Sequence, residues 1–585
     1  MEIPSFLLTF SFCSKGVFVR SPHPTPAKMS QEGARPLSRL AFACLLAVFI
    51  GNIFFIQDFW SLDEATYWGL AQDILSEGIG HAFMPTLWGE PFVENGPLNQ
   101  ILVAILLWIF PSDWQFVAIR TSTLLWFAIA VISVWFTTFH LARRNEAQPI
   151  RLPFGDEAKP LDYARVVADS AVLLLISTFS VTRGVYTADL GIPLLACSCL
   201  SLYGISLSLY HPKRGAFIAG VAAALATLTT SLFAGAWLLA SVLLTNWFVR
   251  AFHHQRKARI RWSISAYACI VLTWIILAYL IDPNRASNWF AQWHQYQIDL
   301  FGIINHDVFT WFGKNFIWFL CPLWPIVLVG LYNWRHHLKE SHIAIPLFMW
   351  ATSVIAGLFS KWLTVTTVFT VWIPALSVLA SFSLFTIKKT RVNILDWFSV
   401  SVFSLASLSI WLYWAAWATH FAPKMEHSIV RLAPNATPEL GLGFVIAVIA
   451  SAIWTSFVLW RVTHRPSVMW RGPWLAASGI TVTSVIFMGL FHPALQENRS
   501  YASVAKAIRQ EVIPHWQPTD CITVSAMPAG TKFSLQYHMT LPLNLAPKAQ
   551  CTFTIHRLRR SASLEASSIK RPHTDEFFIV EHHRQ

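Results

Sequence analysis

Residues 58–78 read DFWSLDEATYWGLAQDILSEG, and the side of the membrane on which this acidic stretch lies decides how the whole chain is threaded. The stretch follows the first long apolar segment, and no Lys or Arg occurs between Asp58 and Arg120. Apolar and aromatic side chains recur at helical spacing at Tyr67, Leu70, Ala71, Ile74 and Leu75. This spacing predicts an amphipathic helix that ends at Gly78 and lies along a membrane surface.

Asp63 and Glu64 stand at the start of this predicted helix, and their position has two interpretations. Ser61-x-x-Glu64 matches a capping box, in which carboxylates in the first turn complement the helix dipole. The same two carboxylates on an outer loop are also candidates for chemistry. The interpretations are compatible, because capping would fix Glu64 and leave Asp63 facing outward.

The composition indicates a polytopic membrane protein. Of 585 residues, 55% are hydrophobic and 12% are charged, whereas soluble proteins carry about 25% charged residues. The formal net charge is +13. Because the basic residues cluster between apolar segments, they are explained as topology signals, and we expect no nucleic-acid partner.

Segments long enough to span a bilayer, roughly 17–25 residues each, number about thirteen. They cover residues 38–57, 120–140, 166–182, 190–210, 215–231, 233–249, 262–281, 316–333, 342–359, 364–386, 393–418, 440–460 and 473–492. The basic clusters fall on one side only if the short segment Leu98–Phe110 does not cross. The N-terminus is then cytoplasmic, and the acidic loop 58–119 and the C-terminus are outside. The predicted order is a leader at 1–37, which includes the short apolar run Phe6–Cys13, and a membrane domain at 38–492.

Four basic residues are expected at the outer surface: Arg183, Arg285, Lys314 and Lys361. Arg183 lies in the stretch 182–189, which we expect to be a short outer turn. Arg285 and Lys314 lie in a long aromatic outer loop at 282–315. Taken singly, each is explained as a solvated turn residue, an interface anchor or a snorkelling side chain. As a set facing an acidic loop, they are candidates for binding an anion.

From residue 493 the composition becomes that of a soluble protein, and residues 493–585 predict a small α/β domain outside the membrane. The pattern predicts a helix at 500–511 and strands at 520–526, 552–556 and 576–581. Cys521 and Cys551 are the cysteines of this region, and both flank predicted strands. In an oxidising compartment they are expected to form a disulfide; two unpaired, buried cysteines are the alternative.

The layout resembles the membrane-embedded C-type glycosyltransferases, in particular bacterial aminoarabinose transferases and protein O-mannosyltransferases. The resemblance is carried by LDEATYW from Leu62, GEPFVENGPL from Gly89, Ala118-Ile-Arg120, Arg143-Arg144 and Tyr186-Thr-Ala-Asp189. It implies a multi-pass protein of the bacterial inner membrane that uses a polyprenyl-phosphate-linked sugar donor. It also implies that Asp63 and Glu64 are the catalytic signature. The aminoarabinose-type lysine after the acidic residue is absent, because Asn95 follows Glu94.

The chemistry of sugar transfer sets out the roles that these residues would take. The acceptor would be a lipid A phosphate, a protein hydroxyl or a glycan. A hydroxyl acceptor needs a carboxylate base, which would be Asp63, whereas a phosphate acceptor is already anionic and needs none, so that Asp63 would orient it or bind metal. Glu94 and Asp189 would position the acceptor or the loop. The departing phosphate needs positive charge. A divalent metal at Asp63 and Glu64 could supply it, as could the four basic residues at the outer surface.

The rival hypothesis is a lipid or sugar transporter or flippase without transferase chemistry. Transporters tend to carry internal repeats and ionisable residues near the centres of their spans. Here no repeat is evident, and the acidic residues gather in the outer loop. The pattern therefore favours the transferase.

Overall fold

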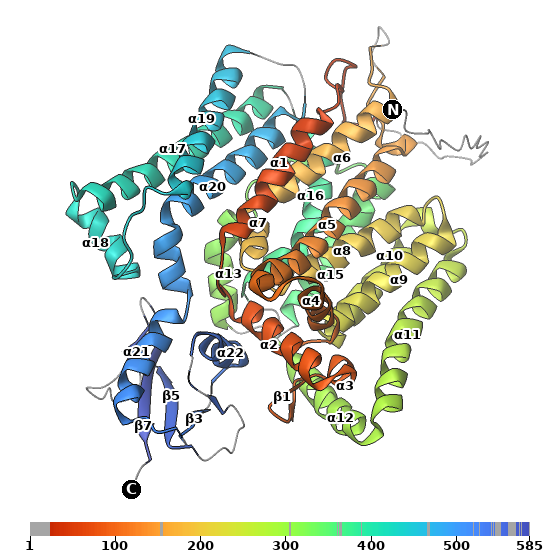
Figure 1. The fold of residues 1–585 in the computed structure, drawn as a ribbon. Helices are drawn as coiled ribbons and strands as arrows, with labels where there is room; N and C mark the ends of the chain where they lie inside the picture. The colour runs from red at the N-terminus through yellow and green to blue at the C-terminus, as the bar shows by residue number, and fades with distance from the viewer. Residues whose placement is uncertain are drawn as a thin grey trace, which may run out of the picture.

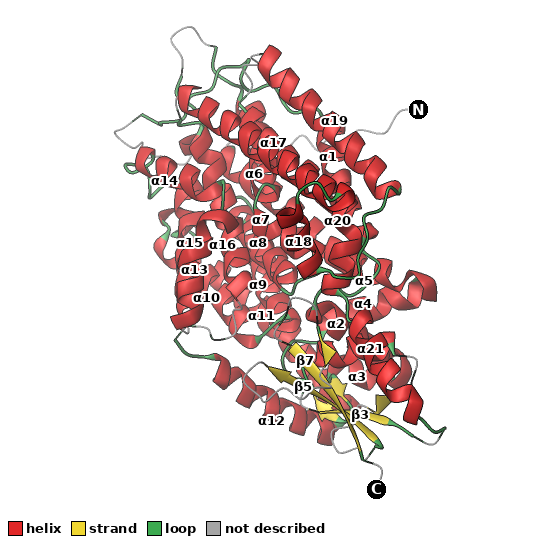
Figure 2. Cartoon of the chain, turned by 90° about the vertical axis from the view of Figure 1, so that its left-hand side faces the viewer, coloured by secondary structure: helices red, strands yellow, loops and turns green. Residues whose placement is uncertain are grey.

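The computed structural model describes residues 24–151, 156–303, 306–359, 361, 365–387, 389–464, 469–518, 520–525, 527–539, 541, 543–544, 551–559, 569–571, 574 and 576–583. Within these residues the chain is mostly helical, and a small sheet lies at one end of the molecule (Figure 1, Figure 2). The predicted apolar run Phe6–Cys13 lies outside the described residues.

A helix coincides with every predicted span. These helices are α1 (Arg39–Gly51), α5 (Gln115–Ala142), α6 (Pro160–Ile176), α8 (Gly191–Leu207), α9 (Pro212–Thr229), α10 (Leu232–Phe248), α11 (Arg256–Ile281), α14 (Leu323–Asn333), α15 (Ser341–Leu358), α16 (Val365–Leu384), α17 (Lys389–Thr419), α19 (Leu442–Thr463) and α20 (Arg471–Arg499). In the described part of the chain, 6 helices are long and apolar enough to cross a membrane, or up to 8 if each of two bent pairs counts as one span. The multi-pass helical class is confirmed, and the number of crossings stays a prediction.

Two expected spans are broken rather than straight. α6 is followed by α7 (Phe179–Tyr186), and the two helices meet at 64°. α13 (His306–Phe319) meets α14 at 84°. The prediction of a short outer turn at 182–189 is therefore wrong in its first half, since residues 182–186 belong to α7. Hydropathy alone does not reveal the break, because both halves are apolar.

Shorter helices lie between the long ones: α2 (Leu62–Glu77), α3 (Ile79–Phe83), α4 (Leu98–Ile109), α12 (Pro283–Leu300) and α18 (Pro423–Leu432). The predicted amphipathic helix is confirmed as α2, with Gly78 at its C-cap in a left-handed conformation at φ 96°. α4 has 12 residues, about 18 Å of helix, too short for a hydrocarbon core about 30 Å thick. The loop 282–315 is largely helical, and the side chain of Asp282 caps α12.

Small residues bring the long helices into close contact. A Cβ atom added at Gly220 of α9 would lie 2.2 Å from the carbonyl oxygen of Ser263 on α11. One added at Gly204 of α8 would lie 2.5 Å from the backbone nitrogen of Ala219 on α9. Such approaches are typical of helices that pack within lipid.

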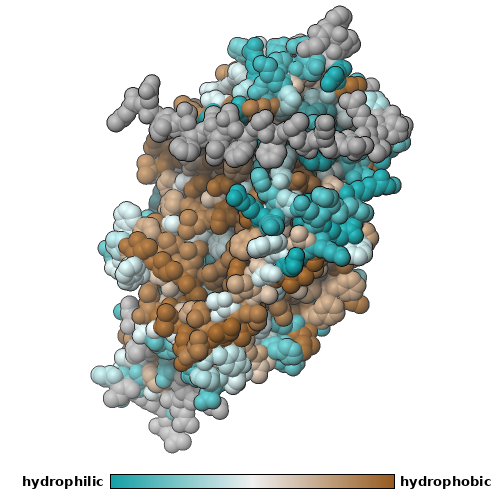
Figure 3. Space-filling model, turned by 90° about the vertical axis from the view of Figure 1, so that its right-hand side faces the viewer, coloured by the Kyte–Doolittle hydropathy of each residue, from teal (hydrophilic) through white to brown (hydrophobic). Residues whose placement is uncertain are grey.

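Large apolar side chains cover much of the outer surface of the helical body. One face shows a broad hydrophobic area, with hydrophilic residues gathered toward its upper end (Figure 3). Leu280 and Leu405 are among the exposed apolar residues on the long helices. A contiguous apolar surface of this kind fits a protein embedded in a membrane.

The C-terminal residues form a five-stranded sheet of order β4-β3-β5-β7-β6. Its elements are α21 (Ala502–Val512), β3 (Ile522–Ser525), α22 (Ala529–His538), β4 (Leu543–Asn544), β5 (Phe553–Arg559), β6 (Ile569–Lys570) and β7 (Glu576–His582). β3 pairs in parallel with β4 and β5, whereas β7 runs antiparallel to β5 and β6. Cys521 and Cys551 form a disulfide beside the β3–β5 pair, with Cα atoms 5.0 Å apart. The predicted helix and three strands are confirmed, whereas α22 was not predicted.

Candidate active site

The start of α2 is held as the sequence predicts, with one change. Ser61 is the N-cap, and its hydroxyl accepts a hydrogen bond of 3.1 Å from the backbone N–H of Glu64. The carboxylate of Glu64 turns back and accepts from the N–H of Trp60 at 3.0 Å, one residue before the cap. The capping geometry thus fixes Glu64 inside the protein.

Glu64 and Arg120 form an ion pair that is closed off from solvent. Arg120 Nη2 lies 2.7 Å from Glu64 Oε1, and both side chains are 0% exposed. The same Nη2 donates to the carbonyl oxygen of Asp58 at 2.8 Å. Burial raises the pKa of Glu64 to about 6, although the charge of Arg120 opposes this shift. In this conformation Glu64 does not reach a substrate, so the structure gives the two predicted catalytic carboxylates different surroundings.

Asp63 lies at the centre of an acidic cluster with Asp189 and Glu94. Burial, together with the charges of Asp189 and Glu94, raises the pKa of Asp63 to about 6. The N–H of Leu190, 3.4 Å from Asp63 Oδ2, and the charge of Arg183 act in the opposite direction. The expectation that Asp63 faces freely outward is wrong, because its side chain is half-buried against the segment that joins α7 to α8.

A tight turn between α7 and α8 places Asp189 beside Asp63. Ala188 adopts a left-handed backbone conformation at φ 45°. Asp189 Oδ1 then accepts from the N–H of Gly191 at 2.8 Å, at the start of α8. The break between α6 and α7 and this turn together bring the polar residues 183 and 189 to the first outer loop.

Of the four predicted phosphate-binding cations, all of which are described, Arg183 is the one whose charge acts on Asp63. Arg285 lies beside the far end of α2, where its guanidinium contacts His81, Met84 and Thr86. Lys314 is exposed on α13, and Lys361 packs against Gly302. The structure therefore does not assemble the four into one site.

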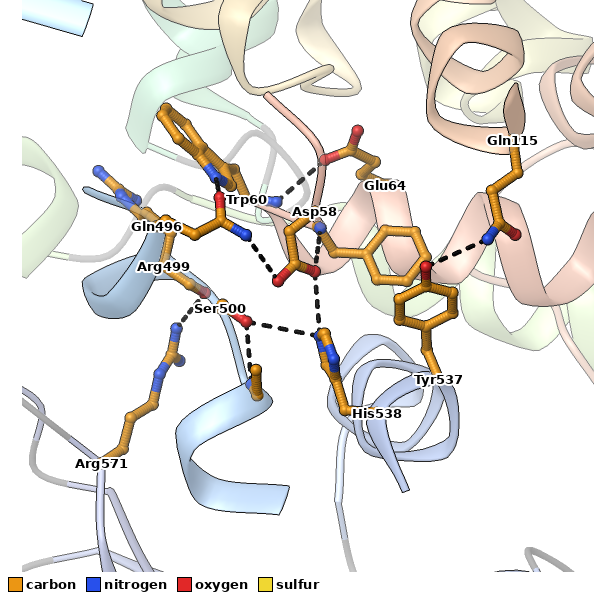
Figure 4. Close-up of polar contacts among 12 residues, drawn as sticks. Asp58, Trp60, Glu64, Gln115, Gln496, Arg499, Ser500, Tyr537, His538 and Arg571 are labelled. Atoms are coloured by element: carbon orange, nitrogen blue, oxygen red, sulfur yellow. Dashed lines mark hydrogen bonds and ion pairs between the residues drawn. The ribbon is translucent and has the colours of Figure 1, made fainter. Parts of the chain in front are cut away.

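Arg499, at the C-terminal end of α20, is a candidate that sequence reasoning missed. Its charge interacts with the charges of Arg183 and Arg571. The carbonyl oxygen of Arg499 accepts from Arg571 at 2.8 Å, and no described residue makes a hydrogen bond with its guanidinium (Figure 4). The signal would have been a basic residue soon after the last predicted span, on the side where the predicted topology has few basic residues.

The C-terminal unit contacts the acidic loop directly through Asp58. One carboxylate oxygen of Asp58 lies 3.0 Å from His538 Nε2 on α22, and the other accepts from Gln496 on α20 at 3.0 Å. Gln496 in turn accepts from the indole of Trp60 at 3.1 Å. Figure 4 shows Asp58 between these partners, with Glu64 on the opposite side of the loop. The cover that α22 places over α2 could not be seen in the sequence, because its contacts join residues hundreds of positions apart.

The described residues do not fit the predicted metal site. The carboxylate of Glu64 pairs with Arg120 and accepts from the N–H of Trp60, so Asp63 and Glu64 do not face a common point where a metal ion could bind. Across the described ranges, no group of three or more His, Cys, Asp or Glu side chains is arranged to hold a metal ion. The positive charge near Asp63 that the structure contains comes from Arg183.

The fold is similar to that of two crystal structures of ArnT from Cupriavidus metallidurans. One is bound to undecaprenyl phosphate and the other is in the apo state; each aligns with a TM-score of 0.60 over 92% of this chain and 97% of that chain, at 14% and 15% identity. An archaeal oligosaccharyltransferase, AglB from Archaeoglobus fulgidus in complex with an inhibitory peptide and a dolichol-phosphate, aligns with a TM-score of 0.39 over 89% of this chain and 70% of that chain, at 12% identity. No protein-family model matches the sequence, and no curated protein matches it. The predicted resemblance to C-type membrane glycosyltransferases is confirmed at the level of the fold.

Proposed function

We propose that this protein, with the fold of ArnT, transfers a sugar from a polyprenyl-phosphate-linked donor to an acceptor hydroxyl at the outer face of the membrane. The observation that carries the proposal is the environment of Asp63. Its carboxyl has a pKa of about 6 and lies beside two further carboxylates and an arginine. A general base works best when its pKa lies near the working pH, which such a value satisfies. The structure of ArnT with undecaprenyl phosphate supports the class of donor.

The reaction assigns a separate task to each side chain. The acceptor oxygen attacks the anomeric carbon and its proton passes to Asp63. The bond between that carbon and the phosphate oxygen breaks, and the polyprenyl phosphate leaves with the electron pair. Arg183 and Arg499 would hold the departing phosphate, since guanidinium groups bind phosphate oxygens in pairs of hydrogen bonds.

Glu94 and Asp189 act through Asp63 in this proposal. Their negative charges raise the pKa of Asp63, which keeps its carboxylate basic enough to take a proton from a hydroxyl. Glu64 holds the loop in place through Arg120. A hydroxyl of lipid A, of a protein or of a glycan fits this chemistry, and the sugar is a hexose or pentose.

The buried carboxylates of Asp169 and Asp396, on long helices, support the transporter hypothesis less than the transferase, because they are paired with arginines. Asp169 pairs with Arg39 at 2.8 Å, and Asp396 pairs with Arg461 and Arg471. Paired charges of this kind stabilise helix contacts and do not mark a transport path by themselves.

Mass spectrometry of envelope lipids and glycoproteins tests the proposal. We expect a sugar-modified species to disappear in a deletion strain and to return with the wild-type gene. Asp63→Asn should not restore it, whereas Asp113→Asn, which changes an exposed carboxylate in the same outer loop, should. Identical species in all strains, or restoration by Asp63→Asn, would contradict the proposal.

The binding of the donor lipid phosphate can be measured separately. Native mass spectrometry of the full chain with undecaprenyl phosphate should show binding that is about tenfold weaker in Arg183→Gln or Arg499→Gln, a loss of about 1.4 kcal/mol. Arg509→Gln removes an exposed arginine of α21 and should leave binding unchanged.

A further inference from the structure

A cavity lies at the other end of α2 from Asp63. Its volume is about 370 Å³, and it is lined by Asp73, Glu77, His81, Thr86, Trp88, Gly89, Pro91, Arg285, Asn288 and Trp289. Asp73 is ten residues along α2 from Asp63, about 15 Å at the rise of a helix. The cavity is therefore separate from the acidic cluster, and nothing in the proposed reaction uses it.

A directional chain of hydrogen bonds forms one wall of this cavity. Arg285 Nη2 donates to Thr86 Oγ1 at 3.2 Å, and Thr86 Oγ1 lies 3.1 Å from His81 Nδ1. His81 Nε2 lies 2.7 Å from the carboxylate of Glu77. Arg285 can only donate, and the carboxylate of Glu77 can only accept. Between them, the hydroxyl of Thr86 therefore donates to His81 Nδ1, and His81 Nε2 donates to Glu77.

This chain leaves part of Arg285 unused. His81 Nε2 carries the hydrogen that is given to Glu77, so it cannot also accept from Arg285 Nη1, which lies 3.0 Å away. Arg285 Nε also lacks a hydrogen-bond partner among the described residues, but it is buried, so Nη1 is the donor left for a ligand. The cavity thus offers a hydrogen-bond donor in Arg285 beside the acceptors of Asp73 and Glu77.

Trp88 is held at the cavity in an unfavourable backbone conformation. Trp88 and Gly89 form the two-residue turn of the hairpin between β1 (Thr86–Leu87) and β2 (Glu90–Pro91), with φ of 52° and 87°. This turn favours Asn, Asp or Gly, and a bulky residue at positive φ is strained. Phe533, 5.1 Å away between ring centroids, and the Nζ of Lys532, 4.5 Å above the indole, hold the ring. Strain that is kept in this way is characteristic of functional sites.

We propose that this cavity binds a neutral pyranose ring, as a sugar unit of the acceptor that is remote from the reacting hydroxyl. Sugar hydroxyls both donate and accept, which matches the two carboxylates, Arg285 and the amide of Asn288. The apolar face of the ring matches the indole of Trp88. The lining residues set two carboxylates, Asp73 and Glu77, against one guanidinium, Arg285, which disfavours anionic ligands; Lys532, on the indole of Trp88, is not among the lining residues. The role in the acceptor rests on the proposed function, whereas sugar binding itself does not.

Saturation-transfer NMR of the full chain in lipid nanodiscs tests the proposal. The probes are the methyl glycosides of glucose, mannose and N-acetylglucosamine, with methyl glucuronide as the anionic counterpart, at a pH of about 7.5. We expect at least one neutral glycoside to receive saturation and the glucuronide to bind about fivefold more weakly, from repulsion by one charge. Signals no greater than those from empty nanodiscs, or equal binding of the glucuronide, would overturn the proposal.

Variants of the full chain locate the binding. Trp88→Ala and Asp73→Asn should abolish the signal. Because Asp73→Asn keeps the shape of the side chain, it still tests the cavity if Trp88→Ala fails to fold. Trp114→Ala, which removes an exposed indole elsewhere, and Asp63→Asn should keep the signal. Retention of the signal in both cavity variants would place the sugar elsewhere and overturn the proposal. Sugar binding without any transfer to envelope acceptors would leave the cavity as a sugar site and would contradict the proposed function instead.

Discussion

Asp63 and Glu64 are neighbours in the sequence, yet their carboxylates have opposite surroundings. Glu64 is enclosed with Arg120 and the N–H of Trp60, whereas Asp63 is half-buried beside two other carboxylates. Consecutive residues of a helix point about 100° apart, so one position can hold the loop while the next meets a substrate. Glu64 therefore belongs to the scaffold of the site.

The pH dependence of transfer should follow the ionisation of Asp63. Because the base works as the carboxylate, the rate should rise with pH to a plateau above an apparent pKa of about 6. Asp189→Asn should move this midpoint to lower pH, since it removes a negative charge that raises the pKa of Asp63. The measurement is the initial rate of polyprenyl phosphate release between about pH 4.5 and 8.

The controls for this profile follow from the sign of the shift. The folded-state pKa of Asp63 lies above its ordinary value of 3.8, so ionisation between about pH 4 and 6 lowers the free energy of unfolding. Asp63→Asn should therefore keep or raise the melting temperature at neutral pH. A midpoint that moves upward in Asp189→Asn would contradict the assignment of the base.

Removal of Arg120 should destabilise the protein strongly. Arg120→Leu leaves the carboxylate of Glu64 buried without its partner, which costs about 3–5 kcal/mol. The double variant Glu64→Leu/Arg120→Leu should recover part of this loss, because no unpaired charge remains. Thermal unfolding of the wild type, Glu64→Leu, Arg120→Leu and the double variant forms a double-mutant cycle, which measures the coupling energy between Glu64 and Arg120. The control is Arg165→Leu, whose half-exposed pair with Asp162 at 4.0 Å should contribute less than about 1 kcal/mol.

At the scale of elements, the contact between α2 and α22 joins the first outer loop to the C-terminal unit. A Cβ atom at Gly530 of α22 would lie 2.2 Å from the carbonyl oxygen of Leu62, and one at Gly69 of α2 would lie 2.2 Å from the ring of Phe533. Gly530 therefore lets the backbone of α22 approach Leu62, the residue before Asp63, whereas Gly69 leaves room on α2 for the ring of Phe533.

Gly530→Ala should weaken this contact. The added methyl group meets backbone atoms, which cannot turn away as a side chain can, so the loss exceeds the gain of up to about 1 kcal/mol in helix propensity. Limited proteolysis should then release the C-terminal unit faster, and transfer activity should fall. Gly313→Ala on α13, where nothing lies within 4 Å, should be neutral or stabilising. Equal protease resistance in the two variants would argue against the contact as a clamp.

The elements that sequence reasoning found are those with a strong local signal. The apolar spacing and Gly78 predicted α2, and span-length apolar runs predicted the long helices. The break before α7 escaped because Ser177 and Thr178 interrupt an otherwise apolar segment without a proline or glycine. The helical character of residues 283–300 was not predicted because polar residues give the segment the composition of a loop, although Ala286, Trp289 and Trp293 fall at helical spacing. Arg499 and His538 could not be assigned to the site, since tertiary contacts alone bring them to the loop.

At the scale of the whole molecule, the predicted threading of the chain through the membrane stays a prediction. α1 begins at one end of the molecule, and β7 lies at the other end (Figure 1). A reporter fused after Arg144 should be active as a cytoplasmic protein, and one fused after Gln585 should be active outside the membrane. Alkaline phosphatase and green fluorescent protein fusions at both positions make the measurement. A cytoplasmic signal at Gln585 would reverse the map of every outer loop.

The hydrogen bond between Asp58 and His538 also has a consequence for the order in which the protein is synthesised and folds. The two residues are 480 positions apart, so the acidic loop is synthesised and inserted long before its partner on α22 exists. Until the last part of the chain has been made and has folded, Asp58 has neither His538 nor the packed surface of α22 beside it. A chain that ends after α20 and before α22 would therefore carry every long helix and still have an uncovered acidic loop. Under the proposed function, the protein would become competent for transfer only when α22 has been made and has folded against the loop.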